Sequence, residues 1–204
     1  KTSMVAGNAK IIKILAGLAV VAFLNLYAGK HEFGLFMIAY SVTFVIAISI
    51  ETFFQTLILY HTGREDQDKD MNSISILPAS LYWGGGISVM AAAIVYCCAV
   101  PIERSLGHDG LIEWLQIMAF FIPAHVLLTL LTTAYRAKQN VMTMALYFDI
   151  YPSILLVGLT ALIWGMDANM YLIGWTHSAA FFLPFAVLFC KAPLRYSAQL
   201  SSFT

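Results

Sequence analysis

The chain has 204 residues, of which 60% are hydrophobic and only 11% are charged, and its mean hydropathy is +0.80. Soluble domains are usually about half apolar and about a quarter charged, so this chain has too little charge to cover a water-exposed surface. Eleven Lys and Arg balance eleven Asp and Glu, which excludes a simple nucleic-acid-binding protein with a basic excess. The low polarity also excludes a disordered chain. These properties leave a membrane protein.

Six stretches contain the roughly 20 mostly apolar residues that a spanning helix needs. They are residues 9–28, 34–60, 74–100, 111–135, 141–165 and 170–190, and short connections between them hold most of the charge. We therefore predict an all-α integral membrane protein in which residues 1–204 form a single domain of six transmembrane helices. A signal peptide is not expected, because no small-residue cleavage site follows the first long apolar stretch. Because the sequence opens at Lys1 rather than Met, we expect a processed or truncated product.

The basic residues are distributed unevenly between the two sides of the predicted spans. If the N-terminus is cytoplasmic, nine lie on the inner side: Lys1, Lys10, Lys13, Arg64, Lys69, Arg136, Lys138, Lys191 and Arg195. The outer side then holds only Lys30 and Arg104. Cytoplasmic loops carry the excess of Lys and Arg, so both termini are predicted to be cytoplasmic.

Three titratable side chains fall within the predicted spans, in the cytoplasmic half of the membrane. Glu51, His125 and Asp149 lie eight to ten residues from the inner ends of their helices, at depths of about 12–15 Å. Intramembrane carboxylates are costly and are by default functional candidates. We therefore favour a cavity or ion-pair role for Glu51 and Asp149. For His125 a functional and a packing role stay open.

Polar residues continue from these positions along the same helix faces. Thr129, Thr132 and Arg136 follow His125 at helical spacing, and Gln55 is one turn from Glu51. A neighbouring row comprises Ser41, Ser49, Thr52 and Thr56. We expect such faces to meet one another or a wet cavity, because lipid would reject them. For the hydroxyls, hydrogen bonding between helices is the favoured alternative.

Helix irregularities are expected at the prolines inside the spans, Pro123, Pro152 and Pro184. At Gly84, Gly85 and Gly86 a neighbouring helix is expected to approach closely. His177 is expected to be a packed or hydrogen-bonded residue. Cys97, Cys98 and Cys190 form no disulfide framework and no CxxC ligand pair.

Catalytic motifs such as GxSxG and HExxH are absent from the sequence. Metal-ligand residue types in the outer loops match no spacing typical of a metal site. We therefore expect no enzymatic activity, no metal and no cofactor, apart from a coupling proton or sodium ion.

Two segments resemble a known family. In residues 28–60, Gly29, Glu32, Phe33, Gly34 and Leu35 fill the pattern G-x-x-E-[FY]-G-[LF]. Residues 130–158 place a basic hinge after a hydroxyl-bearing helix end. Both resemble polysaccharide-exporting flippases of the multidrug/oligosaccharidyl-lipid/polysaccharide exporter superfamily, and the resemblance extends over nearly the whole chain. It implies two six-helix lobes around a cavity, of which this chain supplies one. Because residues 28–60 resemble the opening of the family's sequences, the resemblance implies the N-terminal lobe.

The resemblance implies a function: flipping of a polyisoprenyl-diphosphate-linked oligosaccharide or polysaccharide precursor across a bacterial cytoplasmic membrane by alternating access. The expected partners are the lipid bilayer, the lipid-linked glycan and a second six-helix lobe, which is either a missing C-terminal half or a second copy. Headgroup contacts would come from Lys10, Lys13, Arg136 and Lys138, unless these residues only set topology or bind anionic lipid. Glu51, His125 and Asp149 would exchange the coupling ion.

Two further functions stay open from the sequence. The first is a cation-coupled drug exporter with the same fold, and the second is a non-transporting membrane subunit that scaffolds partner proteins. An intramembrane transferase is the weakest alternative, because no nucleophile–base or metal constellation is visible.

Overall fold

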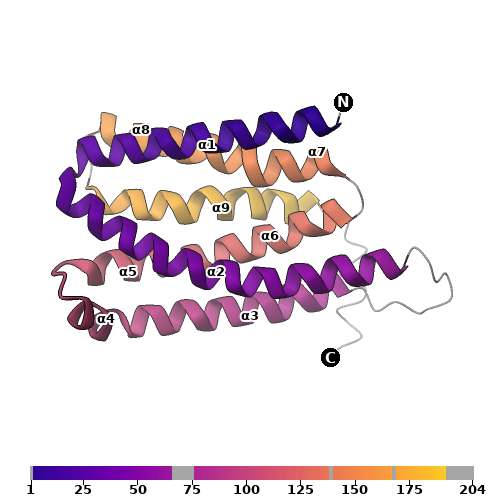
Figure 1. Cartoon of the computed structure of the whole chain (residues 1–204), viewed down its shortest axis with the longest axis horizontal. Helices are drawn as coiled ribbons and strands as arrows, with labels where there is room; N and C mark the ends of the chain where they lie inside the picture. Colours follow the sequence, from indigo (N-terminus) through magenta and orange to yellow (C-terminus); the bar gives the residue numbers. More distant parts are fainter. Residues whose placement is uncertain (1, 66–75, 138–139, 167–168, 192–204) are drawn as a thin grey trace.

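The computed structural model describes residues 2–65, 76–137, 140–166 and 169–191, and these residues form a helical bundle (Figure 1). The first half contains α1 (Thr2–Tyr27), α2 (Gly29–Glu65), α3 (Ile76–Cys97), α4 (Ala99–Leu106) and α5 (Leu111–Ala119). The second half contains α6 (Phe121–Ala137), α7 (Val141–Met144), the π-helix η1 (Ala145–Ile150), α8 (Tyr151–Gly165) and α9 (Tyr171–Lys191). No strand occurs in these ranges.

Within the ranges that the structure describes, six helical segments are long and apolar enough to cross a membrane, which confirms the predicted number of spans. They are Gly7–Tyr27, Gly29–His61, Ile76–Cys97, Leu111–Ala137, Val141–Gly165 and Tyr171–Lys191. The start of α1 and the end of α9 lie at the same end of the bundle (Figure 1). This arrangement agrees with termini on one side of a membrane.

The connection between the first two spans is shorter than predicted. Residues 29–33, expected to be a loop, already belong to α2, and Ala28 alone separates α2 from α1. Gly29 has φ +76°, a left-handed conformation that glycine adopts without steric cost. The chain therefore reverses direction at one residue, and Glu32 lies in the first turn of α2.

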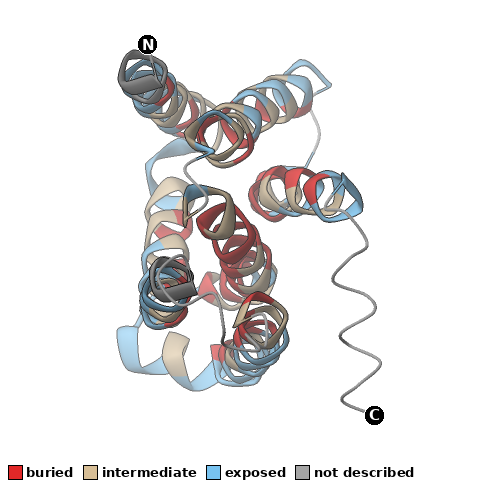
Figure 2. Cartoon of the chain, turned by 90° about the vertical axis from the view of Figure 1, so that its right-hand side faces the viewer, coloured by how far each residue is buried: buried red, intermediate tan, exposed pale blue. Residues whose placement is uncertain are grey.

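Helix α6 is the most enclosed part of the bundle: its buried residues lie among those drawn red near the centre of the end-on view (Figure 2). It packs against α2, α3 and α9. Helix α1 lies on the other side and packs chiefly against α8 and η1. Large apolar side chains such as Leu18, Leu26, Val45 and Ile154 are exposed on the outer helices, as expected where lipid replaces water as the solvent.

Close packing explains two of the three consecutive glycines in α3. A Cβ on Gly84 would lie 2.6 Å from Leu130 Cδ1 of α6, and one on Gly85 would lie 3.1 Å from Leu127 Cδ2. A Cβ on Gly86 would meet no atom within 4 Å. The expected helix approach is therefore confirmed at Gly84 and Gly85, and it is wrong at Gly86.

One hydroxyl row in α2 lies on the outside of this bundle, so the expected hydrogen bonding between helices is not how these hydroxyls are satisfied. Ser41, Ser49, Thr52 and Thr56 are all exposed, and each hydroxyl donates to the carbonyl four residues earlier in its own helix. This local bond satisfies the hydroxyl without a neighbouring helix. The row can therefore lie on the outside of the bundle.

The prolines affect their helices differently. The fourth span is divided at Phe120, between α5 and α6, close to Pro123. The fifth contains the π-helix η1 just before Pro152, whereas α9 continues through Pro184 without interruption. Irregular backbone is therefore present at two of the three expected positions.

Candidate functional site

A lysine of α1 and an aspartate of η1 form an ion pair inside the bundle. Lys13 Nζ lies 3.3 Å from Asp149 Oδ1, and the side chains are 41% and 7% exposed. The same ammonium lies 4.0 Å from the ring centroid of Phe148, at a distance typical of a cation–π interaction. The aspartate side chain is thus buried, whereas the lysine side chain is partly exposed.

The π-helix places Phe148 and Asp149 at this position. Pro152 lies four residues after Phe148 and has no N–H to donate to the Phe148 carbonyl, so a regular α-helical bond is lost there. The Ser153 hydroxyl donates to the Asp149 carbonyl instead of to another helix. Single π-turns within α-helices frequently occur at functional sites.

A second polar pair joins α2 to α6. His125 Nδ1 and Glu51 Oε2 are 3.0 Å apart, with side chains 5% and 9% exposed. The two atoms are close but not aligned for a hydrogen bond, and neither has another hydrogen-bond partner in the described part of the chain. Each group therefore depends on the other for compensation in an apolar interior.

Aromatic rings surround His125 on several sides. Their centroids lie 4.9–6.0 Å from that of the imidazole, and the rings belong to Phe44, Phe121, Phe148 and Phe181. Phe148 contacts both His125 and Lys13. One ring thus connects the Glu51–His125 pair with the Lys13–Asp149 pair.

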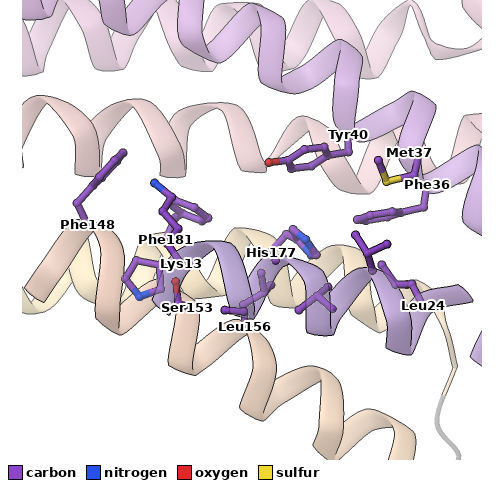
Figure 3. A pocket seen from close by; sticks show the side chains of 15 residues that line it. Lys13, Leu24, Phe36, Met37, Tyr40, Phe148, Ser153, Leu156, His177 and Phe181 are labelled. Carbon is purple, nitrogen blue, oxygen red and sulfur yellow. The ribbon is translucent and has the colours of Figure 1, made fainter. Parts of the chain in front are cut away.

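A cavity of about 230 Å³ lies between α1, η1 and α8 on one side and α2 and α9 on the other. Its walls are mainly apolar, and its polar side chains are those of Lys13, Tyr40, Ser153 and His177. Lys13 and Phe148 lie toward one end and Leu24 toward the other (Figure 3). The cavity therefore combines a long apolar wall with a cation at one end.

The remaining sequence candidates lie away from this cavity. Thr129 and Thr132 are buried in α6, where their hydroxyls donate to the carbonyls of His125 and Leu128 at 2.8 and 2.9 Å. Gln55 is half-buried one turn from Glu51. The exposed candidates Lys10 and Arg136 do not line the cavity, and Lys138 is outside the described residues.

Sequence reasoning missed the aromatic part of the site. Phe148, Phe181 and Tyr40 line the cavity, but aromatic residues are too common in an apolar helix to be singled out from sequence. His177 is packed as expected, with Nδ1 3.0 Å from the Ile173 carbonyl oxygen, and it also lines the cavity. The sequence feature that could have identified Phe148 is its position four residues before Pro152, where an α-helical hydrogen bond is lost.

Glu32 has a structural contact that sequence reasoning also missed. Its carboxylate accepts a 2.9 Å hydrogen bond from the indole N–H of Trp114, whose side chain is fully buried. Glu103 likewise accepts from the backbone N–H of Ile112 at 3.0 Å. These two carboxylates hold helix ends together. Within the described ranges no group of three or more His, Cys, Asp or Glu side chains is placed to bind a metal.

Comparisons of the chain with protein-family models, with curated proteins and with solved structures found no match.

Proposed function

We propose that the protein is a membrane transport protein that flips a polyisoprenyl-diphosphate-linked oligosaccharide across a bacterial cytoplasmic membrane by alternating access. The observation that carries the proposal is the apolar cavity with Lys13 at one end, within a bundle of six apolar helices. A lipid-linked glycan has the matching division into a hydrocarbon chain and an anionic phosphate. The family resemblance of residues 28–60 and 130–158 supports the same function.

Lys13 is suited to the phosphate because its ammonium is a compact charge with several donors. Its side chain is 41% exposed although Asp149 is buried, so an anion can approach it. Lys10 and Arg136 lie outside the cavity, which favours their alternative role in topology and lipid anchoring.

Glu51, His125 and Asp149 are proposed to exchange the coupling proton or sodium ion. The two pairs join different helices, α2 with α6 and α1 with η1. Binding of an ion at either pair changes the attraction between those helices, and so biases the bundle toward one of two conformations. A second six-helix lobe, in the same polypeptide or a second copy, would complete the transport pathway.

The cavity rings also favour a second candidate, a cation-coupled drug exporter. Phe36, Tyr40, Phe148 and Phe181 could receive an organic cation. The cation already present at the end of the cavity, Lys13, argues for an anionic substrate instead. The exporter would place a positively charged substrate near Lys13, whereas the flippase would place a negatively charged one there.

The test is flipping in vesicles that contain the purified protein and a fluorescent polyisoprenyl-diphosphate-linked oligosaccharide, quenched from outside by a membrane-impermeant reagent. We expect the protein to accelerate flipping at least tenfold over empty vesicles and Lys13→Gln to remove most of that acceleration. Lys30→Gln is the matched control, because Lys30 is an exposed lysine outside the cavity. No acceleration by the unmodified protein, or full activity of Lys13→Gln, would contradict the proposal.

The coupling role is tested with the double variant Glu51→Gln/Asp149→Asn in the same vesicles under an imposed proton or sodium gradient. We expect the gradient to accelerate flipping by the unmodified protein and to have no effect on the double variant. Unchanged flipping with unchanged gradient dependence would eliminate these carboxylates as the coupling groups. Uptake of an organic cation by the same vesicles, without glycan flipping, would favour the exporter, and neither activity would favour the scaffold subunit.

A further inference from the structure

We propose that Asp149 acts as a built-in competitor for the substrate: its carboxylate occupies the position on Lys13 that the phosphate of a single-chain anionic lipid takes, while that lipid's hydrocarbon chain enters the cavity. The inference rests on the substrate class of the proposed function and names the site within this chain that receives the lipid phosphate.

The environment of Lys13 leaves room for one exchange of partner. An ammonium has three donor protons. One direction is taken by Asp149 at 3.3 Å and another faces the Phe148 ring at 4.0 Å. The lysine side chain lines the cavity and is 41% exposed. A phosphate can therefore reach the ammonium before the carboxylate leaves it.

The cavity wall extends from Lys13 along one face of α1. The α1 residues that line it follow at helical spacing: Ala16, Gly17, Val20, Val21 and Leu24. From Lys13 to Leu24 this face is about 16 Å long at 1.5 Å per residue. The residues beyond Lys13 on this face are apolar, so the hydrocarbon part of a ligand held at Lys13 meets an apolar wall.

The volume favours a ligand with one narrow chain. The cavity measures about 230 Å³, below the roughly 300–1,000 Å³ of sites that hold a drug-sized ligand. A segment of one isoprenoid chain therefore matches this volume better than the two chains of a phospholipid. The side chains of Phe36, Leu156 and Phe181 supply further apolar lining from three other helices.

The π-helix gives Asp149 a way to withdraw. In η1 the chain contains more residues per turn than an α-helix. Conversion of this turn to α-helical geometry leaves the Phe148 carbonyl without an α-helical donor, because Pro152 has no N–H, and rotates Asp149 relative to the flanking helix by about the 100° that separates successive α-helical residues. Such a rotation takes the carboxylate away from α1, so phosphate binding and a change of η1 are linked.

The experiment measures equilibrium binding of farnesyl phosphate to the purified full chain in detergent, by isothermal titration calorimetry. Two further probes separate the possible sources of affinity, since farnesol lacks the charge and inorganic phosphate lacks the chain. We expect farnesyl phosphate to bind at least tenfold more tightly than either. Asp149→Asn should tighten its binding about two- to fivefold, the factor expected when a partly exposed competing ion pair is removed.

The variants at Lys13 should move affinity in the opposite direction. Lys13→Gln should weaken farnesyl phosphate binding at least tenfold, Lys13→Arg should keep it within about threefold because the cation is retained, and Lys30→Gln should leave it unchanged. Elution volume and thermal unfolding identify any variant that has lost its fold. For such a variant, competition by farnesyl phosphate against a photoreactive analogue in native membranes replaces the detergent measurement.

Several results would overturn the inference. Unchanged or weaker binding by folded Asp149→Asn would make Asp149 a structural partner of Lys13 rather than a competitor. If farnesol bound as tightly as farnesyl phosphate, the Lys13 ammonium would not contribute to binding. If inorganic phosphate bound as tightly, the cavity would not contribute. Lys13-dependent flipping together with unchanged Asp149→Asn binding would refute this inference and leave the proposed function intact. The expected binding pattern without flipping would support this inference and contradict the proposed function.

Discussion

The Glu51–His125 pair allows a sharp test of how polar groups are held in this bundle. Because both side chains are less than 10% exposed and neither contacting atom has another partner among the described residues, removing one should leave the other buried and uncompensated. Loss of one partner of a buried pair costs about 3–5 kcal/mol, whereas replacing both by apolar residues is often neutral or stabilising. We therefore expect Glu51→Leu and His125→Phe each to destabilise the fold by about that amount.

The double variant Glu51→Leu/His125→Phe should behave differently from the sum of its parts. Its phenylalanine enters a site already surrounded by Phe44, Phe121 and Phe181, and no unpaired polar group remains. We expect its free energy of unfolding to lie within about 1 kcal/mol of the unmodified protein, or above it. The implied coupling energy is several kcal/mol, beyond the roughly 0.5–3 kcal/mol common for neighbouring residues.

The measurement is the free energy of unfolding of all four proteins in one detergent or bicelle system, by steric trapping. Thr52→Val is the matched control on α2, because Thr52 is exposed and its hydroxyl donates to the Ile48 carbonyl of its own helix; it should change the free energy by no more than about 0.5 kcal/mol. Additive effects of the two single variants would refute the reasoning. They would mean that the 3.0 Å approach carries no energetic dependence of one group on the other.

Two further predictions concern packing at other positions. Gly84→Ala should lower the free energy of unfolding by about 1–3 kcal/mol, because its Cβ would lie 2.6 Å from the buried Leu130. Gly86→Ala is the control: its Cβ would meet open space, so the same unfolding assay should show a neutral or slightly stabilising effect. Trp114→Phe should lower the free energy of unfolding by about 1–3 kcal/mol, because a hydrogen bond and ring volume are lost. Adding Glu32→Gln should lower it little further, since the bond that Glu32 accepts from the indole N–H is already absent. Fully additive effects in that double variant would contradict this assignment.

The spans could be predicted from the sequence because one physical requirement determines them. A helix must be about 20 apolar residues long to cross the hydrocarbon layer, and each of the six predicted stretches overlaps an observed helix of that kind. The ends of the helices were predicted less accurately. Residues 29–33 contain Lys30, His31 and Glu32 and were expected to be a loop, but a single left-handed Gly29 suffices for the reversal.

The partners of the intramembrane charges could be predicted only in part. Residue counts along the helices placed Glu51, His125 and Asp149 in one layer, but they contain no information on how each helix is rotated about its axis. A span that is apolar all round has no single inward stripe from which that rotation can be read. The pairing of Asp149 with Lys13 rather than with His125 therefore had to come from the structure.

The hydroxyl rows show why polarity alone is a poor guide to the inward face. Thr52 is exposed and Thr129 is buried, yet both hydroxyls donate to the carbonyl four residues earlier. A hydroxyl satisfied by its own helix tolerates lipid and protein equally. A carboxylate cannot satisfy itself in this way, and both intramembrane carboxylates do lie inside the bundle, each against a nitrogen of another helix.

Phe148 makes the two pairs parts of one arrangement. It lies over Lys13 on the cavity side and against His125 on the side of α6. Helix α6 is fixed by close packing against α2, α3 and α9, whereas α1 is held mainly by α8 and η1. A change in η1 that moves Phe148 therefore alters the ion pair at the cavity and the ring contact of the buried pair together. The proposed coupling between ion exchange and lipid binding requires a mechanical connection of this kind, and among the described residues the Phe148 ring provides one.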